Sequence, residues 1–277
     1  MTPSALASLL MIVSGSLHAV VNAIVKGGRD KMASRAVTDA SSALILLPML
    51  AFVPLPAGAW GWLIASAVIH ALYLYALIRA YQVADLSSAY PILRGTAPVV
   101  TALVTIGWIG ERASTADIAG IGLIAAAMFV LVTGRHIGRG ALGWSLLTGL
   151  TIAAYTVIDA HGVRAAPNPF SYIAWLFVMM GAVVVAMFGI IARGRLFASA
   201  AAQWRPGAIA GALSILTYGI ALYAFSIGPT APLAALRETG MVTALLLSVI
   251  FLGERFTAVR VIGVLGILGG AALILAA

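Results

Sequence analysis

Long apolar stretches, separated by short polar connections, follow one another along the whole chain. A membrane-spanning helix needs about 20 mostly apolar residues. Ten stretches have about this length, at residues 4–25, 37–55, 60–82, 88–109, 115–133, 142–162, 169–192, 206–226, 231–252 and 257–276. The apolar runs are continuous and show no two-residue alternation, which argues against a β-barrel. The pattern predicts an all-α integral membrane protein with ten transmembrane helices.

The second half of the chain repeats the first. A shift of 143 residues aligns YPILRGTAPVVTALVTIGWIGERAS (90–114) with LAALRETGMVTALLLSVIFLGERFT (233–257) without a gap, and Arg94 falls on Arg237. This predicts two five-helix repeats, residues 1–137 and 138–277. Because five is odd, the second repeat must enter the membrane from the opposite side. We therefore expect inverted repeats, a common transporter design.

Composition supports the membrane assignment. Hydrophobic residues make up 62% of the chain and charged residues only 9%, whereas a soluble domain carries roughly a quarter charged residues. The mean hydropathy is +1.09. A water-soluble core could not bury this much apolar surface, so we expect the lipid bilayer to be the main partner.

The net charge of +8 is scattered between the apolar stretches, so no nucleic-acid partner is expected. The predicted helices put most basic residues at one end, namely Lys26, Arg29, Lys31, Arg35, Arg79, Arg135, Arg139, Arg193, Arg195, Arg205, Arg255 and Arg260. The other end receives Arg112 and Arg164. By the positive-inside rule the first end is cytoplasmic, so both termini are expected outside.

Arg94 and Arg237 lie inside apolar segments, where an arginine at the helix centre costs about 2.5–3.5 kcal/mol. Two interpretations stay open. Each guanidinium could reach the membrane interface or backbone carbonyls, or it could hold an anionic substrate group in a bidentate fork. Pro91, Gly95, Gly228-Pro229 and Gly240 flank the two positions and would permit discontinuous helices, which often form transporter sites.

Further candidate site residues are polar or aromatic. Glu238 follows Arg237, but helical neighbours do not share a face, so a mutual ion pair is not expected. Glu238 and Asp159 are candidates for binding a substrate amine or for proton coupling, with helix capping as the alternative for Asp159. Aromatic residues inside the bundle predict either packing or an aromatic-lined cavity. These residues are Tyr75, Tyr155, Trp175 and Tyr218.

The first predicted helix offers His18 and Asn22 and contains no acid. Aligning HAVVN with YTVID places Asn22 opposite Asp159. The missing acid weakens the case for a small-multidrug-type proton/cation antiporter, which would use a glutamate there. His70 is expected to be a hydrogen-bonded core residue.

The two Gly-Glu-Arg motifs are markers of the repeat. We interpret Glu111 and Glu254 as turn and capping residues before Ser114 and Thr257. Gly120 and Gly263 are expected to form small-residue packing faces.

No enzymatic constellation is found. The chain has no cysteine, its histidines lack metal-ligand spacing, and no GxxxxGK[ST] phosphate loop occurs. No cofactor, metal or ATP motor is therefore expected, and the driving force would be the solute gradient or a coupled ion. A channel would need a continuous polar stripe along several helices, which is not found.

Ten helices in two inverted repeats, with Gly-Glu-Arg at the end of each fourth helix, resemble the EamA-type families of the drug/metabolite transporter superfamily. SLHAVVNAIVKGGRDK and PILRGTAP are similar to sequences of this group, and the YddG-like amino-acid exporters are the branch that the chain most resembles. The resemblance implies a multi-pass carrier of the bacterial inner membrane. One departure is the uncharged connection VPLPAGAW, where many relatives carry positive charge.

The sequence as a whole predicts a secondary transporter that exports small organic metabolites by alternating access, with amino acids as the expected substrates. Arg237 and Glu238 would supply both charges for a zwitterion, and Arg94 would serve closure or packing. The alternative is a carrier of phosphonates or other phosphorylated anions, because paired arginines also suit phosphate. A monomer is expected.

Overall fold

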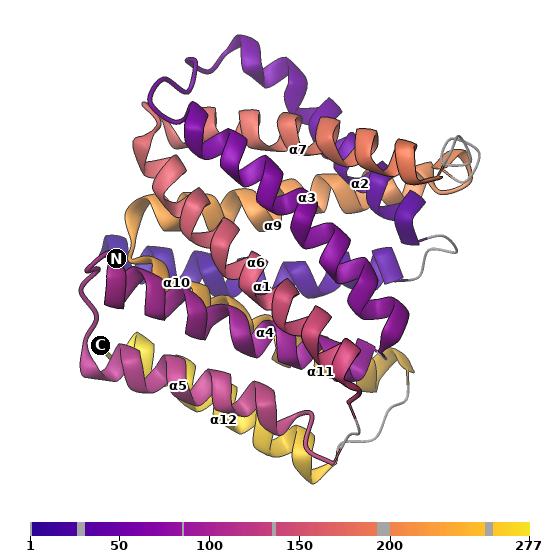
Figure 1. The fold of residues 1–277 in the computed structure, drawn as a ribbon. Helices are drawn as coiled ribbons and strands as arrows, with labels where there is room; N and C mark the ends of the chain where they lie inside the picture. The colour runs from indigo at the N-terminus through magenta and orange to yellow at the C-terminus, as the bar shows by residue number, and fades with distance from the viewer. Residues whose placement is uncertain (1, 27–30, 85, 135–136, 193–199, 253–256) are drawn as a thin grey trace.

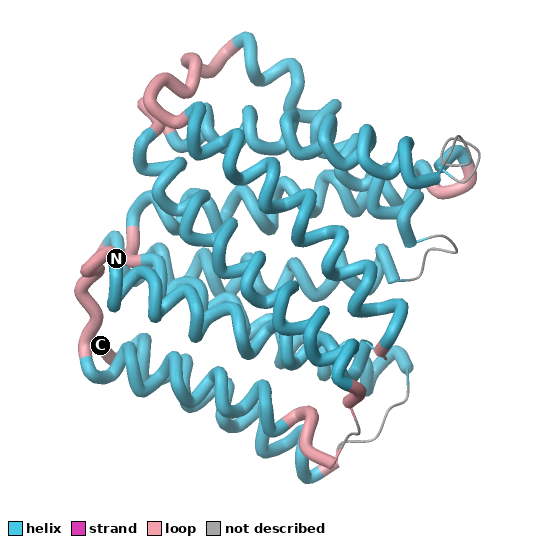
Figure 2. The backbone as a smooth tube through the Cα atoms, viewed as in Figure 1, coloured by secondary structure: helices cyan, strands magenta, loops and turns pink. Residues whose placement is uncertain are grey.

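The computed structural model describes residues 2–26, 31–84, 86–134, 137–192, 200–252 and 257–277. Within these ranges the chain is helical and contains no β-strand. The helices run back and forth along one direction, so both termini lie at the same end of the bundle, on the left in Figures 1 and 2. We call this the terminal end.

The elements follow the apolar stretches closely. They are α1 (Pro3–Lys26), α2 (Lys31–Leu46), the 3₁₀ helix η1 (Leu47–Ala51), α3 (Trp60–Val83), α4 (Leu86–Ala102), the π-helix η2 (Leu103–Trp108), α5 (Thr115–Val130), α6 (Arg139–Ala165), α7 (Pro169–Ala192), α9 (Trp204–Ile227), α10 (Thr230–Leu236), the 3₁₀ helix η3 (Arg237–Thr239), α11 (Gly240–Leu252) and α12 (Ala258–Leu275). In the described residues, eight helical segments are long and apolar enough to cross a membrane, and α5 is a shorter apolar helix.

The second predicted stretch is the one that the structure corrects. Helical structure begins at Lys31 and ends at Ala51, instead of covering 37–55. Arg35, assigned to a connection by its charge, lies inside α2, where its Nε is 2.8 Å from Asp39 Oδ2. The i,i+4 spacing places the two side chains on one helix face, and this pairing lets the helix begin before the apolar run.

Two layers of helices form most of the bundle. In one layer α3 packs on α6, α6 on α4, and α4 on α5. In the other, α9 packs on α1, and α1 on α10, η3 and α11, with α12 beside them. The pairs α2–α7 and α5–α12 lie at opposite edges of the bundle in Figure 1.

The main helix contacts have counterparts when helices of the two chain halves are exchanged, although α6–α9 and α7–α9 have no strong counterpart in α1–α3 and α2–α3. Replacing α1 by α6, α3 by α9, and α4 by α10–α11 turns the contact α3–α6 into α9–α1, and α4–α6 into α10/α11–α1. The contacts α2–α7 and α5–α12 map onto themselves.

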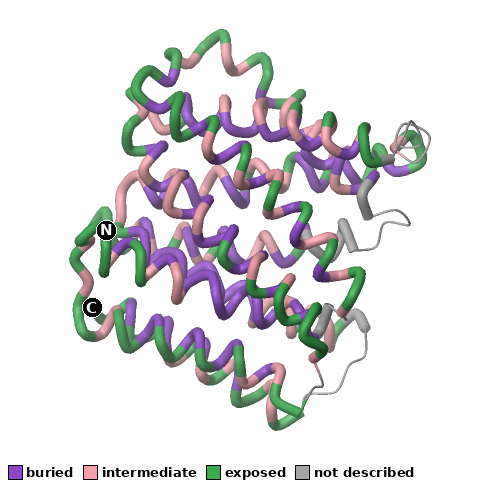
Figure 3. Tube along the Cα trace, viewed as in Figure 1, coloured by how far each residue is buried: buried purple, intermediate pink, exposed green. Residues whose placement is uncertain are grey.

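Buried residues follow the inner sides of the helices, while exposed residues lie along the outer sides (Figure 3). Many of these exposed residues are large and apolar, including Leu44, Val68, Leu103 and Leu265. In water such a surface would be unfavourable, whereas lipid tails solvate it. The outer surface of the bundle therefore fits a membrane.

Glycines bring helices into close contact where α5 packs on α12. A Cβ atom on Gly120 would lie 2.6 Å from the Gly270 carbonyl oxygen, and one on Gly263 would overlap Leu131. The predicted packing faces at Gly120 and Gly263 are confirmed. Ser114 and Thr257 are the N-caps of α5 and α12.

Candidate functional site

A break in the helix after α10 positions Arg237 and Glu238. The α-helix ends at Leu236, η3 forms one 3₁₀ turn, and α11 starts at Gly240. All residues of α10 and η3 are buried. The break agrees with the discontinuity that the flanking residues predict. Arg94 differs, because α4 continues through it with Pro91 and Pro98 inside the helix.

The break is held by direct backbone contact with α1. A Cβ atom on Gly15 would overlap the Arg237 carbonyl oxygen, and a Cβ atom on Gly240 would overlap the backbone of Gly15. Any side chain here would force the two helices apart. Glycine at both positions therefore lets α1 fix the backbone that carries Arg237 and Glu238.

Glu238 pairs with the arginine of the other half of the chain. Arg94 Nε lies 3.0 Å from Glu238 Oε2, and the two side chains are 7% and 3% exposed. The two atoms are within ion-pair distance, yet the N–H is not aligned with the oxygen, and Oε2 has no hydrogen-bond partner among the described residues. The predicted absence of an ion pair between Arg237 and Glu238 is confirmed.

Arg237 is buried without a carboxylate. Arg237 is 6% exposed, and no described carboxylate lies within ion-pair distance of it. No described atom accepts a hydrogen bond from its Nε. Its guanidinium carbon lies 5.1 Å from the centre of the Tyr218 ring, in cation–π range. The two arginines that the repeat aligns therefore differ, because Arg94 has a counter-ion and Arg237 has an aromatic face.

Asp159 holds the Tyr218 ring in place. The carboxylate is fully buried and accepts hydrogen bonds from the Tyr218 hydroxyl and, at 2.8 Å, from the Tyr172 hydroxyl.

Tyr155 stacks on His70 with ring centroids 4.2 Å apart, and His70 Nδ1 contacts the Ser66 carbonyl at 2.9 Å. His70 is the hydrogen-bonded core residue that the sequence predicts.

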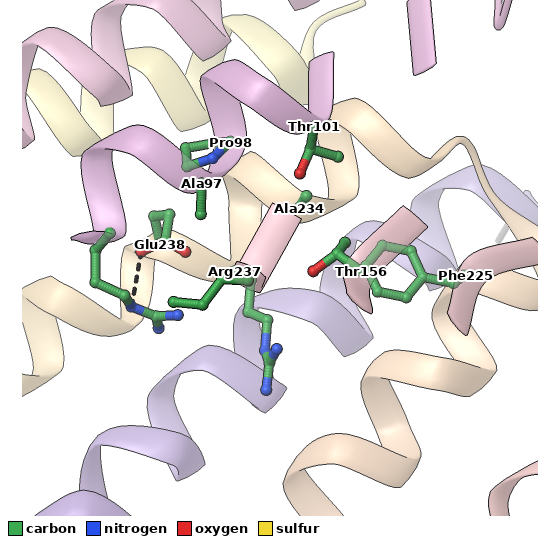
Figure 4. A pocket seen from close by; sticks show the side chains of 10 residues that line it. Ala97, Pro98, Thr101, Thr156, Phe225, Ala234, Arg237 and Glu238 are labelled. Carbon is green, nitrogen blue, oxygen red and sulfur yellow. Dashed lines mark ion pairs between the residues drawn. The ribbon is translucent and has the colours of Figure 1, made fainter. Parts of the chain in front are cut away.

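A small cavity lies where the arginines and Glu238 meet (Figure 4). In the figure Arg237 and Glu238 extend to different sides from adjacent positions, and the dashed line marks the Arg94–Glu238 ion pair. The lining residues are Arg94, Ala97, Pro98, Thr101, Ile152, Thr156, Phe225, Ala234, Arg237 and Glu238. The cavity volume is about 10 Å³, roughly what one water molecule needs. A substrate would enter only if these helices moved apart.

The structure brings some predicted site residues together and separates others. Arg94, Arg237 and Glu238 line the cavity, while Tyr218, Tyr155 and Asp159 form the adjoining aromatic layer. Tyr75 is 44% exposed and packs edge-on against Trp144. His18, half-buried in α1, and Trp175, which packs edge-on against Trp60 at 5.0 Å, are not among the lining residues. The side chain of Asn22 lies outside the described residues.

Glu111 has a different role from the one that its motif predicts. Gly110 supplies the turn, with φ of +82°, a backbone conformation that glycine adopts readily. The N-cap of α5 is completed by Ser114 and Asp117 without Glu111. Glu111 instead accepts hydrogen bonds from Arg164 and Thr230. Glu254 lies outside the described residues.

The surroundings of Glu111 favour its ionised form. Partial burial would raise its pKa, but the hydrogen bonds from Thr230 and Arg164, together with the Arg164 charge, lower the pKa below the ordinary value. Sequence analysis missed this pair because 53 positions separate its members. It also missed Arg35–Asp39, although the i,i+4 spacing was a usable signal.

Comparisons with known proteins agree with the fold. Residues 139–276 match the EamA-like transporter family, and residues 56–124 match the Small Multidrug Resistance protein family. The two matches support membership of the drug/metabolite transporter superfamily. A solved structure titled "Crystal structure of protein" is similar in fold, with a TM-score of 0.72, 20% identity and 98% of both chains covered. No curated protein matches the chain.

Proposed function

Because its second half matches the EamA-like transporter family, we propose that this multi-pass membrane protein is a secondary transporter that exports amino acids by alternating access. The observation that carries the proposal is the Arg237 guanidinium, which is buried, lines the same cavity as Glu238 and lacks a counter-ion among the described residues. An unpaired buried charge is costly unless a ligand compensates it. Arginine suits a substrate carboxylate because its planar fork donates two parallel hydrogen bonds.

The balance of buried charge favours a zwitterion over a phosphorylated anion. In the described part of the membrane region, three arginines and three acids are buried or half-buried, namely Arg35, Arg94, Arg237, Asp39, Asp159 and Glu238. These charges cancel when all six groups are ionised. An amino acid adds no net charge, whereas a phosphate group adds about two negative charges. Glu238, which also faces the cavity, would accept the substrate ammonium group.

We propose ten membrane crossings in two inverted halves, residues 1–137 and 138–277. Eight helical segments already qualify by length and composition, and α5 and α2 would supply the other two. Support comes from the gapless 143-residue shift, from both termini at one end, and from the main helix contacts, which correspond when the halves are exchanged. Rocking one half against the other would open the cavity to each side in turn.

Counterflow in proteoliposomes tests the substrate class. Vesicles preloaded with unlabelled amino acids should accumulate labelled amino acids from outside. Phosphonates and organic cations should exchange no faster than in protein-free vesicles. Exchange of phosphonates without exchange of amino acids would overturn the zwitterion assignment and favour the anion-carrier alternative.

The orientation follows from the loop charges. In bacteria we expect the protein in the inner membrane with both termini outside the cytoplasm. Among the described residues, the basic ones at the terminal end are Arg112 and Arg164, and basic residues stay inside. A C-terminal reporter that fluoresces only in the cytoplasm should stay dark in whole cells. Bright fluorescence would reverse the assignment.

A further inference from the structure

A cluster of hydrogen bonds joins the two halves of the chain at the terminal end. Arg164 Nη1 donates to Glu111 Oε1 at 2.9 Å, its Nε donates to the Phe225 carbonyl at 2.9 Å, and its Nη2 donates to the Gly228 carbonyl at 2.7 Å. The Thr230 hydroxyl and main-chain N–H donate to the two oxygens of Glu111 at 2.7 and 2.9 Å. We call this set of contacts the Glu111 tether.

The Glu111 tether connects elements that would separate if the terminal end opened. Glu111 lies in the connection after η2 in the first half, and all its partners in the cluster lie in the second half. Its main-chain N–H is itself bonded to the Thr105 carbonyl at 2.8 Å, which fixes the Glu111 backbone to η2.

The tether is directly linked to the cavity. Phe225 lines the cavity with its side chain and accepts the Arg164 hydrogen bond with its carbonyl. Thr101 lines the cavity seven residues beyond Arg94, about 10 Å nearer the terminal end at 1.5 Å per residue. The route from the arginines to the terminal end therefore runs past Thr101 and Phe225 and then meets Arg164.

We propose that the Glu111 tether is the gate that closes the terminal end of the transport path. The inference rests on the proposed alternating access, and it assigns Glu111 and Arg164 as positioning residues that do not touch substrate. Their side chains are 15% and 31% exposed, so water can replace their mutual bonds when they separate. A partly exposed ion pair contributes only modestly to the free energy of the closed state. This suits a contact that must form and break in every transport cycle.

Thiol labelling tests the gate without any substrate. The chain has no cysteine, so Thr101→Cys would be the single thiol, placed in the cavity. A membrane-impermeant maleimide is applied to intact cells and to inverted vesicles. Ala57→Cys, at an exposed position in the connection between η1 and α3, identifies which preparation presents the terminal end.

With the tether intact, Thr101→Cys should label slowly from the terminal end. Adding Glu111→Gln or Arg164→Gln should raise the labelling rate about tenfold, because charge-assisted hydrogen bonds that favour the closed state are lost. Arg112→Gln is the matched control, since Arg112 is exposed and should leave the rate unchanged. Arg164→Lys, which keeps the charge but loses the fork, should give an intermediate rate.

The outcomes separate the gate from the substrate proposal. An unchanged labelling rate in both glutamine variants, with or without a lower Tm, would show that the tether only stabilises the fold and would overturn the gate. Faster labelling combined with failed amino-acid counterflow would uphold the gate and overturn the substrate class.

Discussion

Arg237→Ala is expected to abolish amino-acid transport while the protein still reaches the membrane. Removing one partner from a desolvated charge contact costs about 2–5 kcal/mol, which is about 30-fold to several thousand-fold in substrate affinity. Arg237→Lys keeps the charge but loses the bidentate geometry, so transport should also fall. Substrate binding and flux should be measured at matched expression.

Measurements of Tm distinguish a substrate-binding role of Arg237 from a structural role. Arg237 has no carboxylate partner among the described residues, so its replacement leaves no opposite charge unpaired. Arg237→Met, which retains much of the side-chain volume, should therefore leave Tm in detergent unchanged or raise it. Normal transport by Arg237→Ala would show that the assignment of the carboxylate site is wrong.

In contrast to replacement of Arg237, Arg94→Ala should cause a large loss of stability. It would leave the Glu238 carboxylate, 3% exposed, without its counter-ion. Breaking a buried pair in this way costs about 3–5 kcal/mol, so Tm should fall well below that of Arg237→Ala.

A double-mutant cycle provides the control for this prediction. Glu238→Gln alone leaves Arg94 unpaired, Arg94→Met alone leaves Glu238 unpaired, and the double variant removes both charges. If the ion pair holds the site together, the double variant should lose much less stability than the two single changes combined. Additive losses would contradict the coupling. Complete transport loss in Arg94→Ala at normal Tm would instead assign substrate binding to Arg94.

The helix pattern could be read from the sequence because lipid imposes a simple rule on the chain. Each crossing must satisfy its backbone hydrogen bonds internally and present apolar side chains, which requires about 20 apolar residues. The bounds of α3, α7 and α9 therefore follow the predicted stretches closely. The rule failed for α2, where Arg35 and Asp39 pair inside the helix.

The candidate site could be predicted in part for a similar reason. A buried arginine in an apolar run is unusual enough to notice in a single sequence, and the repeat indicated that Arg94 and Arg237 occupy corresponding positions. Glu238 was found as a neighbour of Arg237, but no sequence pattern indicated that its counter-ion would be Arg94, 144 positions away.

The sequence by itself determined the membrane class, the limits of most apolar helices, and the two arginines. Those features depend on composition and on spacing along one helix. The tertiary structure alone decided which arginine is neutralised, that Asp159 holds Tyr218, and that Glu111 reaches Arg164 and Thr230. Each of these contacts joins helices far apart in the chain, and their geometry depends on how closely the backbones approach, as at Gly15 and Gly240.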